Sequence, residues 1–170
     1  MNPMEALKII LLCMSVAVLF GILHDQVTAR ICVEYFTIGH PRVIASESPT
    51  MLAFVWGVLA TWWVGLLLGV PLALASRLGS QAKRSARSLL RPLAKLVSVM
   101  AVGSLTFGML GYLLARQGVV ELQDPIASRI SPERHVLFLA DLWAHSASYL
   151  FAFGGGIVLI WRTHKSRATK

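Results

Sequence analysis

The chain has 170 residues, of which 56% are hydrophobic and only 14% charged, and its formal net charge is +8. A soluble domain carries about 25% charged residues. This composition, with a mean hydropathy of +0.67, therefore excludes a water-soluble protein and indicates a single membrane domain over residues 1–170. The positive charge does not indicate a nucleic-acid partner, because eight of the sixteen Lys and Arg residues stand in two acid-free blocks that follow long apolar segments.

Four apolar segments follow one another along the chain, and each is predicted to be a transmembrane helix. The predicted spans are residues 6–24, 50–76, 94–115 and 136–161. The fold class expected is therefore all-α, a membrane bundle of four helices. The first segment also resembles a secretory signal peptide, with Val27-Thr28-Ala29 as the cleavage pattern. Retention of this segment as a span and its removal by cleavage both stay open.

The connections between the spans differ in charge, and this predicts the orientation. The 77–93 connection and the chain after Trp161 hold the two basic blocks, made of Arg77, Lys83, Arg84 and Arg87, and of Arg162, Lys165, Arg167 and Lys170. The 25–49 and 116–135 connections are nearly neutral. Because basic connections stay on the cytoplasmic side, both termini are expected in the cytoplasm and the two neutral loops outside. The membrane expected is the bacterial inner (plasma) membrane, with lipid as the first partner.

Small residues recur every four positions along two of the spans. They are Gly57, Thr61, Gly65, Gly69 and Ala73 in the second, and Ala144, Ser148, Ala152 and Gly156 in the fourth. Such strips let helix backbones approach closely inside a bilayer. They predict a tight bundle, or a homo-oligomer or membrane complex that uses one strip externally. Pro71 is expected to kink the second span, and Cys13 and Cys32 are expected to stay unpaired.

Titratable side chains gather on the predicted outer side, where four of the five histidines lie. Asp141 and His145 stand inside the fourth span and share one helical face, because they are four residues apart. Ionisable groups inside a membrane are costly and mark functional sites. Imidazole and carboxylate groups suit zinc, iron or manganese. The candidate ligands are His24, Asp25, Glu34, His40, Asp141 and His145.

Alternatives to a metal site remain open. Asp141 could hydrogen-bond His145 or another helix and only fix the packing of the bundle. A proton or ion path is disfavoured because the polar face stops near Tyr149. A haem between two histidines is disfavoured because His24 is expected at the surface and His145 deep in the bundle. The best prediction is a metal-binding protein, either a metalloenzyme or a redox-associated protein. The runner-up is a non-catalytic membrane accessory or assembly protein.

The segment from Asp25 to Pro41 is too polar to span and too aromatic for an idle linker. It is expected either to lie in the headgroup region or to fold over the mouth of the bundle as a lid that brings Glu34 and His40 above His145. On one continuous helix Asp25 and Glu34 would point to opposite faces, so both can serve one site only if the helix breaks between them.

Three stretches carry a resemblance to a group of bacterial inner-membrane proteins of uncharacterised function. They read HDQVTARICVEYFTIGHP from His24, ATWWVGLLLGVPLALA from Ala60 and ADLWAHSASY from Ala140. The resemblance spans nearly the whole chain. It implies a four-span fold and a bacterial source, and it implies neither an activity nor a role for any residue.

Overall fold

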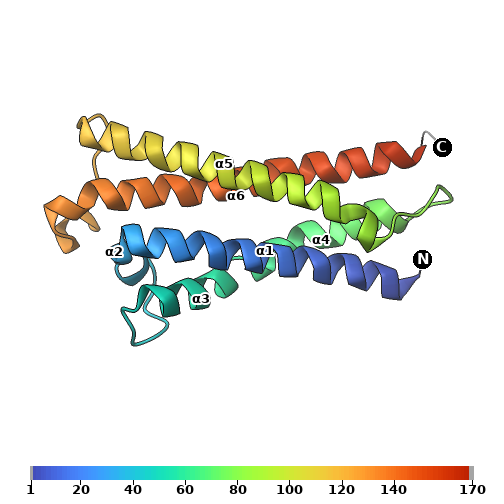
Figure 1. Ribbon diagram of the computed structural model, residues 1–170, viewed down its shortest axis with the longest axis horizontal. Helices are drawn as coiled ribbons and strands as arrows, with labels where there is room; N and C mark the ends of the chain where they lie inside the picture. The colour runs from blue at the N-terminus through green and yellow to red at the C-terminus, as the bar shows by residue number, and fades with distance from the viewer. Residues whose placement is uncertain (1, 169–170) are drawn as a thin grey trace.

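The computed structural model describes residues 2–168, and it contains only helices and connections over that range. Four helical rods run side by side (Figure 1). They are α1 (Pro3–Ile31), α3 (Pro49–Leu59) continued by α4 (Trp62–Arg77), α5 (Ala86–Arg116) and α6 (His135–Ala168). The short elements are α2 (Val33–Thr37), η1 (Ala127–Arg129) and η2 (Pro132–Arg134). All four rods are long and apolar enough to cross a membrane, which confirms the all-α bundle of four spans.

Polar N-cap residues mark the start of three of the long helices. The side chain of Asn2 accepts hydrogen bonds from the first turn of α1, and Ser48 and Ser85 do the same for α3 and α5. Pro3 and Pro49 follow two of these caps. Proline suits the first helical turn because its missing N–H would have no partner there. Local chemistry therefore sets where these three helices start.

The second rod is interrupted at Ala60–Thr61, between α3 and α4. The interruption frees main-chain carbonyls, and the hydroxyl of Tyr149 donates to the carbonyl of Ala60 at 3.1 Å. The hydroxyl of Thr61 donates to the carbonyl of Gly57. Helix α4 runs through Pro71 without a break, and the kink expected there stays a prediction. Partly buried side-chain donors satisfy these carbonyls, which is how broken helices are tolerated at membrane depth.

The rods pack as two pairs, α1 with α3 and α4, and α5 with α6, with sparser contacts between the pairs. The strip of small residues on α3 and α4 faces α1. A Cβ atom on Gly65 would lie 2.5 Å from the Cα of Met14. Gly108 of α5 approaches Ala144 of α6 in the same way, at 3.1 Å. The close approach that the strips predicted is confirmed, and it is used inside the bundle.

The helices extend beyond the apolar segments, and this extension positions the site. Helix α1 continues past Leu23 to Ile31, and its last two turns carry the buried Asp25 and Thr28. The start of α1, the end of α6 and the 77–85 connection lie at one end of the bundle, here named the termini end (Figure 1). Helix α2 and the 117–134 connection lie at the other end, here named the α2 end.

Candidate metal centre

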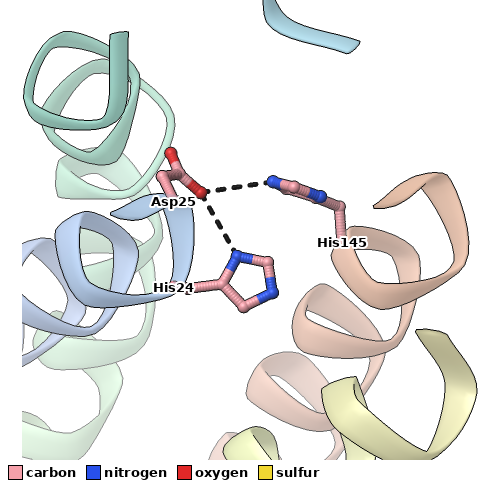
Figure 2. Close-up of side chains that lie close together, drawn as sticks. All are labelled: His24, Asp25 and His145. Carbon is pink, nitrogen blue, oxygen red and sulfur yellow. Dashed lines mark hydrogen bonds and ion pairs between the residues drawn. The ribbon is translucent and has the colours of Figure 1, made fainter. Parts of the chain in front are cut away.

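Three of the six candidate ligands come together inside the α2 end of the bundle. His24 and Asp25 project from α1 and His145 projects toward them from α6, as Figure 2 shows. One ligand atom of each residue lies within 4.8 Å of the others. The Oδ1 atom of Asp25 is 3.2 Å from His24 Nδ1 and 3.2 Å from His145 Nε2. All three side chains are about nine-tenths buried, so water contributes little to their stabilisation.

The second ring nitrogen of His145 fixes which tautomer this imidazole adopts. Nδ1 lies 2.8 Å from the main-chain carbonyl of Asp141. A carbonyl oxygen only accepts hydrogen bonds, so Nδ1 must carry the proton and donate. In the neutral ring, Nε2 then presents its lone pair to Asp25. An imidazole held by a main-chain carbonyl in this way is the usual arrangement of a metal-ligating histidine.

The tautomer of His24 follows from a chain of two hydrogen bonds. The hydroxyl of Ser104 donates to the carbonyl of Ala144 at 2.6 Å. Because the only hydroxyl proton of Ser104 is already donated to that carbonyl, the hydroxyl oxygen must accept a hydrogen bond from His24 Nε2, which lies 2.8 Å away. Because Nε2 carries the proton, Nδ1 of the neutral ring directs its lone pair at Asp25.

Both histidines thus aim a lone pair at the same carboxylate oxygen. Each of these lone pairs is repelled by the carboxylate oxygen that it faces at 3.2 Å unless a positive charge lies between them, either protons or a metal ion. Zinc binds imidazole nitrogen and carboxylate oxygen at about 2.0–2.2 Å, so neighbouring tetrahedral ligands lie about 3.3–3.5 Å apart. The two separations of 3.2 Å that involve Asp25 are therefore close to those of a metal centre, and all three ligand atoms lie within 4.8 Å of one another.

A cavity adjoins the three side chains and offers about 60 Å³ of space that water can enter. That is room for a few water molecules, and it is too small for a haem. The two imidazole rings also touch, with centroids 4.5 Å apart and planes at 89°. The expectation that His24 sits at the surface while His145 lies deep was wrong, because α1 continues past Leu23 and buries His24 beside His145.

Helix α2 covers this cavity as a lid. Tyr35 stacks on His145, with ring centroids 4.4 Å apart and planes at 28°, and Phe36 is also buried against the bundle. Burial raises the pKa of Tyr35 above its ordinary value, so its phenol stays neutral. The break at Cys32 between α1 and α2 turns the aromatic side chains inward. The Asp25–Pro41 segment was expected either to lie in the headgroup region or to form a lid, and Tyr35 and Phe36 take the positions expected of a lid.

Glu34 belongs to the lid but lies away from the three-residue group. Its carboxylate accepts from Arg134 Nε and Nη2 at 3.0–3.1 Å and from the thiol of Cys32 at 3.3 Å. Burial alone would raise the pKa of Glu34, but the hydrogen bonds from Arg134 outweigh it and the pKa is lowered. Burial and the neighbouring Glu34 raise the pKa of Cys32 to about 12. The thiol therefore stays protonated, and neither cysteine is in a disulfide.

His40 and Asp141 complete the candidate set without joining the group. Nδ1 of His40 lies 2.8 Å from the carbonyl of Tyr35, and its ring lies against Trp56 on the wall of the cavity. Asp141 is 1% exposed, and its Oδ2 has no hydrogen-bond partner among the described residues. Its main-chain carbonyl, not the carboxyl group that the sequence suggested, contacts the ring of His145.

Sequence reasoning missed Ser104 and the stacking role of Tyr35. Ser104 is a polar residue inside an apolar segment, but this signal is weak. Serine and threonine in membrane helices often donate to the carbonyl four residues earlier, as Ser98 and Thr106 do on the same helix. Only the packing of α5 against α6 shows that Ser104 donates across the interface instead.

Comparison of the chain with protein-family models, with curated proteins and with solved structures finds no match in any of the three. The functional argument therefore rests on the geometry of the site.

Proposed function

We propose that this chain is a multi-pass protein of the bacterial inner membrane that binds a transition-metal ion through His24, Asp25 and His145. The α2 end faces the outside in this proposal, because the basic connections gather at the termini end and basic connections remain cytoplasmic. The observation that carries the proposal is the convergence of two histidine lone pairs on one buried carboxylate oxygen.

The ligand set indicates which metals fit. Two imidazoles and one carboxylate suit zinc, iron or manganese. Three protein ligands leave a coordination position open, and sites of this kind activate water or polarise a substrate oxygen. The adjoining cavity is roofed by Tyr35 and walled by His40, Ser148 and Tyr149, so it supplies polar groups near that position. A metalloenzyme or a redox-associated protein agrees with this arrangement.

The test is elemental analysis, with an optical spectrum, of the full-length protein purified in detergent without chelator. Wild type is compared with His145→Ala and Asp25→Asn, and with His164→Ala as the matched control, since His164 is an exposed histidine on the same helix. Near-stoichiometric zinc, iron or manganese in the wild type and the control, lost in both site variants, is the expected result. Wild-type protein that holds no metal and takes up none when supplied would overturn the proposal.

The second candidate is an accessory or assembly protein in which the same residues only hold α1 against α6. The observation that favours it is that distances of 3.2 Å also lie within the range of N–H···O hydrogen bonds, which the imidazoles would donate if they carried a second proton. In that case no metal is bound, and His145→Ala lowers the melting temperature of protein that never contained metal. Melting curves of metal-free samples, recorded beside the elemental analysis, separate the two functions.

A further inference from the structure

A second cavity, of about 450 Å³, opens at the termini end of the bundle. It lies between the start of α1, the connection from α4 to α5, and the end of α6. Four of the side chains that line it are basic and one is acidic, namely Arg77, Lys83, Arg84, Arg167 and Glu5. The cavity is far from the candidate metal centre, which is buried at the α2 end.

One of the four basic side chains, that of Arg167, has a structural role. Arg167 is 3% exposed, and its guanidinium group donates to the main-chain carbonyls of Ala75, Leu78 and Ala82. These carbonyls end α4 and begin the connection to α5. A buried arginine that donates to several carbonyls closes the C-terminal end of a helix, so this side chain shapes the cavity.

The other three cations have no carboxylate partner among residues 2–168. Arg77 donates to the carbonyl of Arg84, and Arg84 donates to the hydroxyl of Ser166. The ammonium group of Lys83 donates to the carbonyl of Gly79. The Nε atom of Arg77 is buried and has no hydrogen-bond partner among the described residues. The cavity therefore holds positive charge that no carboxylate of residues 2–168 neutralises.

The one acid in the cavity does not offset this charge. The carboxylate of Glu5 accepts from the main-chain N–H of Ala86 at 2.8 Å and lies 3.7 Å from the ammonium group of Lys8. The N-terminal end of α5 also opens here, with Ser85 as its cap, and the positive end of its dipole adds to the attraction for an anion.

We propose that this cavity binds a phosphate group, which is either the headgroup phosphate of an anionic lipid or free phosphate. Arginine and lysine bind phosphate oxygens through charge-assisted hydrogen bonds. Basic pockets between helices, at the level where the chain leaves the apolar layer, are suited to anionic headgroups. The proposal is independent of the metal centre, because it uses other residues at the opposite end.

The test uses the full-length protein in a neutral detergent. Native mass spectrometry measures the binding of phosphatidylglycerol and of zwitterionic phosphatidylcholine, and inorganic phosphate is then added as a competitor. Arg84→Gln and Lys83→Gln are compared with Arg91→Gln, which removes an exposed arginine of α5 outside the cavity. Lys83→Gln is the variant least able to disturb folding, because the lysine side chain is exposed and donates to one carbonyl.

We expect phosphatidylglycerol to bind more tightly than phosphatidylcholine, and each cavity variant to weaken it about tenfold, as the loss of one hydrogen bond to a charged group does. Arg91→Gln should bind as the wild type does. Displacement by millimolar inorganic phosphate would assign free phosphate to the site, and resistance would assign the lipid. Equal binding of the two lipids without binding of phosphate, or an equal loss in Arg91→Gln, would overturn the proposal.

Discussion

Ser104→Ala gives a sharp test of the proposed metal centre because it removes no proposed ligand. In the wild type, the hydroxyl of Ser104 accepts from His24 Nε2 at 2.8 Å and donates to the carbonyl of Ala144 at 2.6 Å. The variant leaves His24 free to move its proton to Nδ1, the nitrogen that faces Asp25. A ring in that tautomer cannot bind a metal through Nδ1.

The expected loss of affinity can be bounded. Removal of a hydrogen bond that orients a metal-ligating histidine typically lowers metal affinity by about 10–100-fold, equivalent to about 1.4–2.7 kcal/mol. The upper part of this range is expected here, because Ser104 is 3% exposed and water cannot easily replace its hydroxyl group. The measurement is a zinc titration of metal-free protein in competition with a chelator of known affinity.

Ser98→Ala is the matched control for this titration. Ser98 lies on the same helix, is exposed, and donates only to the carbonyl of Ala94, so its loss should leave zinc affinity unchanged. Wild-type affinity in Ser104→Ala would refute the assignment of the His24 tautomer. An equal loss in both variants would trace the effect to α5 as a whole and would refute the role of the Ser104 hydroxyl group.

Further predictions concern the other residues. Asp141→Asn should keep the metal and should not lower the melting temperature, since the replaced Oδ2 has no partner, whereas Asp25→Asn should lose the metal in the elemental analysis. Gly65→Ala should destabilise the bundle by about 1–3 kcal/mol through overpacking against α1. Gly154→Ala, with open space around it, should stay within about 1 kcal/mol of the wild type in denaturant titrations. Glu34→Gln should lower stability at neutral pH. Because the folded pKa of Glu34 is depressed, this deficit should be full above its ordinary value of 4.5 and should vanish as pH falls through the lowered folded pKa. A melting-temperature deficit that persists in strong acid would contradict the role of its ion pair with arginine.

Several features of the fold could be predicted from the sequence because they depend only on the local composition of the chain. The four apolar segments, the small-residue strips and the free cysteines each follow from residues close together in the chain. The break at Ala60–Thr61 could not be predicted in this way. It depends on the hydroxyl of Tyr149 from another helix, whereas the local signal, Pro71, pointed to a different turn of the same span.

For the site, too, the sequence indicated which residues were candidates, but which of them converge depends on tertiary structure. His24, Asp25 and His145 were among the six candidates because ionisable groups are rare in apolar segments. Which of the six converge depends on the length of α1, and the apolar pattern ended that helix about two turns too early. Glu34 was separated from the site by Arg134, 100 residues away in the chain, and no spacing in the sequence indicates that pairing.

The choice between protons and a metal ion at the site follows from counting donors. Both contacts of Asp25 use the same oxygen, Oδ1, and the other nitrogen of each imidazole already donates to a buried acceptor. One added proton, on either imidazole or on the carboxyl group, satisfies one contact and leaves the other as two facing lone pairs. Two added protons satisfy both contacts in one of two ways. Either two imidazolium rings lie 4.5 Å apart beside a single carboxylate, which like-charge repulsion and burial both disfavour, or one imidazolium ring lies beside a protonated carboxyl group while the other imidazole stays neutral, which is disfavoured because the carboxyl group is the stronger acid. One divalent ion satisfies all three acceptors while both rings stay neutral. This is the physical reason for preferring the metal centre to a purely structural hydrogen-bonded cluster.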